Sequence, residues 1–254
     1  MVSTATLHSK SDLGNSLAIR VRCTDGSWTC QPGQFYLLRT GDAWSPYLRR
    51  ALFPSFIDPN ELGFLIRPSQ DPAMVWLAAQ PVGAELDLIG PLGRGFVADA
   101  HQRRILLAAD GAAESLLALI SPALARQASI TLLLHARQRA DLLPASALPP
   151  AIEYYTSCDD PQSGLPAAMD DELARALSWA DGLYLAGSTA FLARAKVAVT
   201  AARFMVTRGF AQAVAPAPLP CGVGACRACL VDTGRGLHRA CVRGPVFDLG
   251  DLAL

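Results

Sequence analysis

The chain carries little charge, and neither sign is in excess. Charged residues make up 17% of its 254 residues, and 22 Lys and Arg balance 22 Asp and Glu, which leaves a formal net charge of zero at pH 7. A nucleic-acid-binding protein or a polybasic membrane anchor needs an excess of Lys and Arg. The sequence also lacks an uninterrupted apolar run of about 18 residues, the length that a membrane span requires. We therefore expect no nucleic-acid partner and no transmembrane segment.

Residues 1–20 lack the features of a secretory signal peptide. They contain no unbroken apolar stretch and no small-residue cleavage site. We therefore expect a cytoplasmic protein, in a reducing compartment that disfavours disulfides. Histidine is scarce as well, and no residue suggests an acid–base catalyst. The histidines are scattered along the chain at His8, His101, His135 and His238.

Cysteine, in contrast, is concentrated near the C-terminus. Four of the seven cysteines follow the pattern C-x4-C-x2-C and, after eleven intervening residues, a last C: Cys221, Cys226, Cys229 and Cys241. This is the ligand spacing of plant-type [2Fe–2S] proteins. Gly222 and Gly224 lack a Cβ, so the loop backbone can approach a cluster and point N–H groups at its sulfurs. We predict that these four cysteines hold a [2Fe–2S] cluster and that the chain carries electrons.

Two other interpretations of the four cysteines stay open. A structural zinc site usually has two C-x2-C knuckles, whereas this chain has one, preceded by a glycine-rich x4 segment. A pair of disulfides would require an oxidising compartment. The remaining cysteines, Cys23, Cys30 and Cys158, are far apart in the sequence and are expected to be buried thiols.

Three segments follow one another along the chain. Residues 1–100 contain short apolar or alternating runs separated by Gly and Pro turns, at 17–22, 35–39, 62–67 and 85–90. This pattern predicts an antiparallel β-barrel.

From 101 to 205 strand-like and helix-like runs alternate, which predicts an α/β domain with a parallel sheet. The expected strands are 104–109, 129–135, 152–156 and 183–186, and the expected helices are 112–126, 170–180 and 189–203. Residues 206–254 form a small cluster module, in which 230–232 and 237–239 predict a hairpin that returns Cys241. The Pro- and Ala-rich stretch 211–220 is expected to be a linker.

Several motifs carry a resemblance to a known family. They are the run 221–229 (CGVGACRAC), the run 241–247 (CVRGPVF), and the segments 32–35 (PGQF), 48–50 (LRR) and 85–96 (ELDLIGPLGRGF). In these motifs and in the order of its segments, the chain resembles the electron-transfer subunits of NAD-linked dihydroorotate dehydrogenase, within the ferredoxin–NADP reductase superfamily. The resemblance implies an FAD-binding barrel, a nucleotide-binding α/β domain and a C-terminal [2Fe–2S] module.

The resemblance also assigns FAD-binding positions in the barrel. An Arg that meets the FAD pyrophosphate, followed after two residues by Ser or Thr, maps here to Arg50 and Phe53. A second strand and a Gly-Thr pair at a helix N-terminus complete the set. The implied FAD-binding residues are Arg50, Ala51, Leu52, Phe53, Leu65, Ile66, Arg67, Ala73 and Met74. Phe53 has no hydroxyl, and Ala73-Met74 replaces Gly-Thr; the alternative is that Arg50 and Arg67 are solvated barrel arginines.

The nicotinamide site that the resemblance implies departs further from the family pattern. The turn after the strand 104–109 keeps only one glycine, Gly111, between Asp110 and Glu114. Two carboxylates beside this turn would repel the phosphates of a nicotinamide cofactor. Gly187, in a later turn, is compatible with a tight turn as well as with a ligand. We expect impaired NAD(P) binding.

The sequence therefore predicts an electron-transfer subunit of a hetero-oligomeric oxidoreductase. It would relay electrons between FAD and a catalytic flavoprotein or other redox subunit through the [2Fe–2S] cluster. The alternative is a non-catalytic wire or assembly subunit that has lost NAD(P) and possibly FAD binding. A third possibility is a zinc-stabilised interaction protein.

Overall fold

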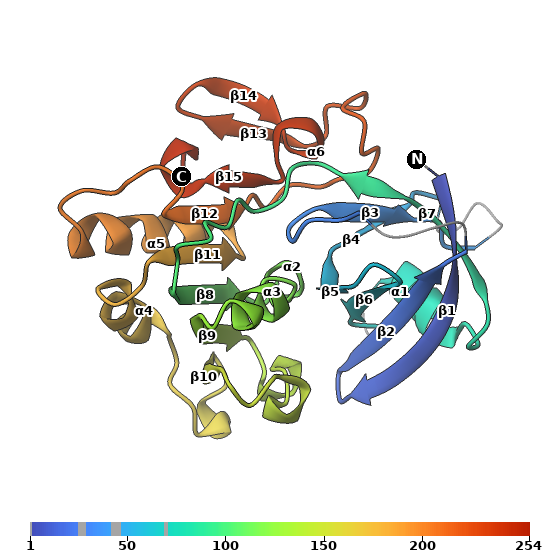
Figure 1. Ribbon diagram of the computed structural model, residues 1–254, viewed down its shortest axis with the longest axis horizontal. Coiled ribbons are helices and arrows are strands. Elements are labelled where there is room, and N and C mark those ends of the chain that lie inside the picture. The colour runs from blue at the N-terminus through green and yellow to red at the C-terminus, as the bar shows by residue number, and fades with distance from the viewer. Residues whose placement is uncertain (1, 25–28, 42–46, 69–70) are drawn as a thin grey trace.

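A computed structural model describes residues 2–24, 29–41, 47–68 and 71–254. The strands of the N-terminal third form one half of the molecule, and a second sheet with flanking helices forms the other (Figure 1). A short hairpin module sits over one end of the second sheet. Among the described residues, no helix combines the length and the apolar character needed to span a bilayer.

Seven strands build the N-terminal half, in the order β4-β3-β7-β1-β2-β6-β5. All neighbouring pairs are antiparallel. Their bounds are β1 (Val2–Leu13), β2 (Ser16–Cys23), β3 (Phe35–Leu38), β4 (Arg50–Leu52), β5 (Pro54–Ile57), β6 (Glu61–Ile66) and β7 (Glu85–Leu92). The two strands at the ends of this order, β4 and β5, are separated in the chain only by Phe53, so the sheet wraps round on itself. The predicted barrel is confirmed.

One helix, α1 (Pro72–Ala79), covers an end of the barrel. It begins sharply because Asp71 caps it: the carboxylate accepts a hydrogen bond from the N–H of Ala73, and Pro72 occupies the first turn, where no N–H is required. Ala73, Met74 and Leu77 are buried in the barrel core.

The second sheet has the order β10-β9-β8-β11-β12-β15, and only β15 is antiparallel to its neighbour. The bounds are β8 (Arg104–Asp110), β9 (Ser129–Ala136), β10 (Glu153–Cys158), β11 (Gly182–Ala186), β12 (Ala211–Val214) and β15 (Val246–Asp248). The helices are α2 (Glu114–Leu117), α3 (Ile120–Ala125), α4 (Asp170–Leu177) and α5 (Thr189–Ala202). Along β8, Leu106 packs toward α4 and α5, whereas Leu107 packs toward α2 and α3. The sheet is thus covered on both faces, as the α/β pattern predicts.

Two expectations about this half need correction. The run 112–126 forms two short helices rather than one, and Pro122 lies in the first turn of α3, where its missing N–H costs no hydrogen bond. The stretch 211–220 is not a linker throughout, because Ala211–Val214 is the buried strand β12, paired with β11 and β15. Small residues beside prolines give a weak strand signal.

The cluster module is an insertion between β12 and β15. It contains the predicted hairpin, β13 (Leu230–Thr233) and β14 (Gly236–Arg239), and a short helix α6 (Ala240–Arg243). Since β12 and β15 belong to the second sheet, the expected boundary between 205 and 206 separates strands that pair. We propose that the α/β domain comprises the residues up to about 216 and, after the cluster module, strand β15.

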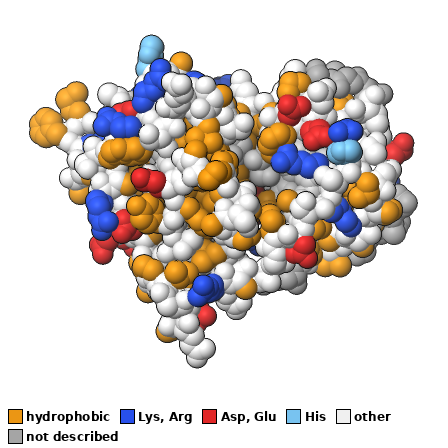
Figure 2. All heavy atoms as spheres, turned by 60° about the horizontal axis from the view of Figure 1, so that its bottom comes forward, with side chains coloured by type: hydrophobic (Ala, Val, Ile, Leu, Met, Phe, Trp, Pro, Cys, Tyr) orange, Lys and Arg blue, Asp and Glu red, His pale blue; other side chains and the backbone are white. Residues whose placement is uncertain are grey.

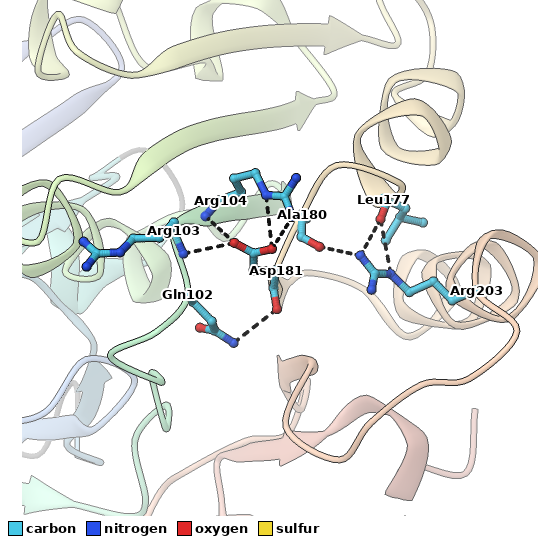
Figure 3. Close-up of polar contacts among 7 residues, drawn as sticks. All are labelled: Gln102, Arg103, Arg104, Leu177, Ala180, Asp181 and Arg203. Atoms are coloured by element: carbon cyan, nitrogen blue, oxygen red, sulfur yellow. Dashed lines mark hydrogen bonds and ion pairs between the residues drawn. The ribbon is translucent and has the colours of Figure 1, made fainter.

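Asp181 ties two neighbouring strands together where they begin (Figure 3). Its carboxylate accepts hydrogen bonds from the backbone N–H groups of Arg103 and Arg104 and from the Arg104 guanidinium, whose Nη2 lies 2.6 Å from Oδ1. The hydrogen bond from Arg104 is the main reason that the pKa of Asp181 lies below its usual range. On the far side, Arg203 donates to the carbonyls of Leu177 and Ala180. These contacts stabilise the edge of the sheet where β8 and β11 begin. The loops that follow β8 and β11 lie at the opposite edge.

Candidate iron–sulfur and flavin sites

The four predicted cluster ligands lie as two pairs. The Sγ atoms of Cys221 and Cys226 are 3.3 Å apart, and those of Cys229 and Cys241 are also 3.3 Å apart. No group of three or more His, Cys, Asp or Glu among the described residues is arranged to hold a single metal ion. A two-iron cluster instead takes four cysteine sulfurs, two on each iron. All seven cysteines are free thiols, so the structure does not support the disulfide alternative.

The loop backbone favours the thiolate form of Cys221. Hydrogen bonding from the N–H of Cys226, with help from Val223 and Ala225, lowers the pKa of Cys221 to about 6. The thiolate is the form that binds metal. Gly222 and Gly224 adopt φ of 67° and 78°, and a Cβ on Gly222 would lie 2.6 Å from the Cδ1 of Leu92. Both glycines are therefore needed for the turn, as the sequence predicts.

The inner pair is buried against the barrel. Cys229 and Cys241 pack with Phe35 and Leu37 of β3, and burial raises the pKa of Cys241 to about 12. Cys226, by contrast, is exposed. A cluster on these four sulfurs would extend from the barrel contact to the molecular surface.

Arg50 faces an internal carboxylate. Its Nε lies 2.8 Å from Oδ2 of Asp71, whose other oxygen accepts from the N–H of Ala73 at 2.9 Å. Partial burial alone would raise the pKa of Asp71, but the hydrogen bonds from Arg50 and Ala73 outweigh it and hold the pKa below its usual range. Asp71 thus occupies the position, between a guanidinium and a helix N-terminus, that suits an anion. Arg50 is therefore not a merely solvated arginine.

Arg67 connects the barrel to the α/β domain. Its Nη1 lies 3.0 Å from Oε1 of Glu114 and donates to the carbonyl of Gly111 at 2.8 Å. Burial raises the pKa of Glu114, while Arg67 opposes that shift. The Nε of Arg67 is buried and has no hydrogen-bond partner among the described residues. A buried donor of this kind fits an oxygen of a ligand.

The other predicted flavin residues present no polar side chain to a ligand. Leu52, Ile66, Ala73 and Met74 are buried in the barrel core, and Leu65 is buried in the core shared with the α/β domain. Ala51 and Phe53 pack toward the cluster module. Phe53 also lines a cavity of about 200 Å³, together with residues from the turns after β8, β11 and β12: Ala112, Glu114, Ser115, Ala186, Gly187, Val214, Ala215, Pro216, Ala217 and Leu219.

The predicted flavin residues therefore provide some, but not all, of the contacts expected for a bound flavin. The orphaned Nε of Arg67 and the cavity beside Phe53 favour a ligand between the two domains, whereas Asp71 already occupies the Nε of Arg50, where it would compete with a pyrophosphate. Sequence reasoning missed Asp71. The available signal was its place directly before Pro72, which is typical of a helix N-cap.

The charges at the expected nicotinamide-binding turn differ from those that the sequence predicts. Glu114 is paired with Arg67, so its charge is balanced, and Asp110 is the carboxylate that remains, accepting a hydrogen bond from Ser188 at 2.6 Å. A Cβ on Gly187 would lie 2.8 Å from the Cβ of Asp110. Gly187 is thus required by the close approach of the two turns, which is a sufficient structural reason for a glycine there.

A barrel, a doubly covered α/β sheet and an inserted four-cysteine loop define a ferredoxin reductase-like electron-transfer protein. Among solved structures, an NADH-dependent reduced ferredoxin–NADP oxidoreductase has a TM-score of 0.80 at 19% identity, covering 98% of this chain and 89% of that one. A ferredoxin reductase of carbazole 1,9a-dioxygenase has a TM-score of 0.66 at 22% identity, covering 79% of this chain and 65% of that one. These likenesses show the fold.

Sequence comparison gives the family. Residues 219–253 match the family model of the iron–sulfur cluster binding domain of dihydroorotate dehydrogenase B. The electron transfer subunit of dihydroorotate dehydrogenase B (NAD(+)) from Shouchella clausii is 31% identical over 232 residues, covering 88% of this chain and 87% of the relative. Its counterpart from Desulforamulus reducens is 25% identical over 240 residues, covering 85% and 84%. The chain belongs to the family of electron transfer subunits of dihydroorotate dehydrogenase B.

Proposed function

We propose that this chain relays electrons, through a [2Fe–2S] cluster, between a flavin held between its barrel and α/β domain and a catalytic partner subunit. When bound, FAD can exchange electrons in pairs with a hydride donor and singly with the cluster. The observation that carries the proposal is the placement of the four thiols, which lead from the barrel contact of Cys229 and Cys241 to the exposed Cys226.

The chain's own residues supply two kinds of cofactor contact. Cys221, Cys226, Cys229 and Cys241 would hold the cluster, and the N–H groups of the loop stabilise negative sulfur. Arg50 and Arg67 would hold the anionic part of FAD, for which planar guanidinium groups are suited. Phe53, with the residues that line its cavity, would exclude water between the flavin and the cluster module.

The surface around Cys226 fits a protein partner. Val223, within the loop that carries Cys221 and Cys226, is 66% exposed, and Val242, which lies against Gly224 of that loop, is 39% exposed. Arg227 and Arg243 are exposed nearby, and neither forms an ion pair among the described residues. Apolar side chains with unpaired arginines around them are typical of a docking surface. We propose that the catalytic subunit docks here in a hetero-oligomer, in the cytoplasm.

Co-expression with the catalytic subunit encoded in the same organism tests this function. The purified complex should contain FAD and a [2Fe–2S] cluster in this chain, and a reduced catalytic subunit or a reduced donor should bleach both chromophores. A complex with the cluster but without flavin in this chain would favour the wire alternative. Zinc in place of iron and sulfide would favour the interaction protein.

A further inference from the structure

A cavity of about 400 Å³ lies between the barrel and the α/β domain, separate from the cysteine loop and from the cavity beside Phe53. The barrel contributes side chains of β2, β5 and β6, and the α/β domain contributes α3 and the segment 143–149. Its walls are mostly apolar, with Phe56, Ile57, Ile120, Leu124 and Leu148 among them. On the face shown in Figure 2, hydrophobic side chains gather along the middle, where the two halves of the molecule meet.

Arg20 is the cationic residue in the wall of this cavity. Its guanidinium lies 3.6 Å from the centre of the Phe56 ring, which covers one face of the group and leaves its N–H edges free. No hydrogen bond and no ion pair within 4.0 Å involves this guanidinium in the described part of the chain. Burial lowers the pKa of Arg20, while Glu61 and Asp58, which lie farther off, raise it.

The neighbouring strand β6 leaves room for the side chain of Arg20. In the register of β2 and β6, Arg20 lies across from Gly63. A Cβ on Gly63 would come within 2.9 Å of the Cβ of Phe56 and 3.3 Å of the Cδ and Nε of Arg20. Any other residue at 63 would therefore push the stacked pair out of place. Arg22, two residues along the same strand, shows the contrasting case, since Glu61 pairs with it at 2.8 Å.

We propose that this cavity binds a small carboxylate with an apolar body, whose carboxylate pairs with the free edge of Arg20. A single guanidinium with an unoccupied edge suits one carboxylate, because the planar fork can donate two parallel hydrogen bonds. The apolar walls suit an aromatic or aliphatic body, and the volume lies within the usual range for small-molecule sites. Such a ligand would touch both domains, so it would also stabilise their association. The site does not depend on the redox role of the chain.

Isothermal titration calorimetry of the full-length protein with 2-naphthoate and with its neutral isostere 2-naphthamide tests the site. We expect naphthoate to bind at least about tenfold more tightly, the low end of what a charge-assisted hydrogen bond contributes. Arg20→Gln should weaken naphthoate by a similar factor and abolish the preference, whereas the control Arg22→Gln should change neither. Ala147→Trp, at an exposed lining position, should weaken both compounds.

Three results would overturn the proposal. They are equal affinity for the acid and the amide in the wild-type protein, naphthoate binding that Arg20→Gln leaves unchanged, and no binding of naphthoate at millimolar concentration. Thermal unfolding of each variant without ligand separates a lost site from a misfolded chain. If Arg20→Gln lowers the Tm markedly, Arg20→Lys keeps the charge but loses the planar fork, and it should bind naphthoate more weakly than wild type.

Discussion

Arg67 and Glu114 form an ion pair across the two domains, with Nη1 3.0 Å from Oε1. Because Arg67 also donates to the carbonyl of Gly111, the barrel is attached to the turn where a nicotinamide cofactor's phosphates would approach. The ion pair balances the negative charge of Glu114, one of the two acidic residues at that turn. Asp110 is then the main electrostatic obstacle to a dinucleotide phosphate.

We expect NADH to reduce the wild-type protein poorly and Asp110→Asn to bind NADH more tightly. Removing one carboxylate charge near a phosphate is worth roughly 1–2 kcal/mol at an effective dielectric of about 20, or about tenfold in Kd. Asn can keep the hydrogen bond to Ser188. Anaerobic titration with NADH measures the affinity, and Asp58→Asn, in the turn between β5 and β6, serves as the control. Rapid, saturable reduction of wild type by micromolar NADH would refute the argument.

Arg50 and Asp71 give a second prediction, on FAD affinity. Arg50→Ala should release FAD while the cluster stays, because we propose the guanidinium as the main anion contact on the barrel. Asp71→Asn should raise FAD affinity by about tenfold, since Asn can still cap α1 but no longer competes for Arg50 as an anion. Flavin fluorescence during dialysis at fixed FAD concentrations measures both.

The matched control for Asp71→Asn is Asp87→Asn. Asp87 pairs with Arg49 at 2.7 Å in the same barrel, but no helix N-terminus shares its carboxylate. Asp87→Asn should leave FAD affinity unchanged. If Asp71→Asn lowers FAD affinity or leaves it unchanged while wild type binds FAD, the carboxylate does not compete with the cofactor.

Cysteine substitutions inside and outside the cluster module should differ in their effect on bound iron and sulfide. Cys226→Ser and Cys241→Ser should each reduce bound iron and acid-labile sulfide together, because we propose that both cysteines are ligands of one cluster. Cys158→Ser should leave both at the wild-type level, since this buried thiol lies in β10, outside the cluster module. Iron and sulfide assays on protein from an iron-replete host decide the matter. Equal loss in all three variants would point to instability rather than ligation.

Asp181→Asn should destabilise the protein in a pH-dependent way. The folded pKa of Asp181 is lowered by Arg104, so its contribution is fully present above the unfolded value of about 3.9 and is lost as pH falls through the folded pKa. Because the pair lies near the surface, solvent screens it and the contribution is small. The Tm difference between wild type and variant should stay constant from pH 7.5 to 5 and shrink below pH 4. A constant difference at all pH values would contradict this account.

Much of the architecture was predictable because the signals are local. The C-x4-C-x2-C spacing and the glycines of its loop predict a turn that the φ angles of Gly222 and Gly224 confirm. Alternating strand and helix runs predict the parallel sheet. The strand Ala211–Val214 was not predictable in this way, because its identity as a strand comes from pairing with β11 and β15 rather than from its own small residues.

The candidate flavin site was only partly predictable for a related reason. Arg50 and Arg67 were found from short motifs, but their partners Asp71 and Glu114 lie 21 and 47 residues further along the chain. Sequence spacing alone does not show that a carboxylate already faces each guanidinium. The same holds for Arg20, whose significance depends on Phe56 and on the gap that Gly63 leaves.

The most direct test of the central claim is the metal and sulfide content of the native protein, purified anaerobically, together with its electron paramagnetic resonance spectrum after dithionite reduction. We predict about two irons and two acid-labile sulfides per chain and a signal from one unpaired electron on the reduced cluster. Stoichiometric zinc without sulfide, and no such signal, would contradict the account.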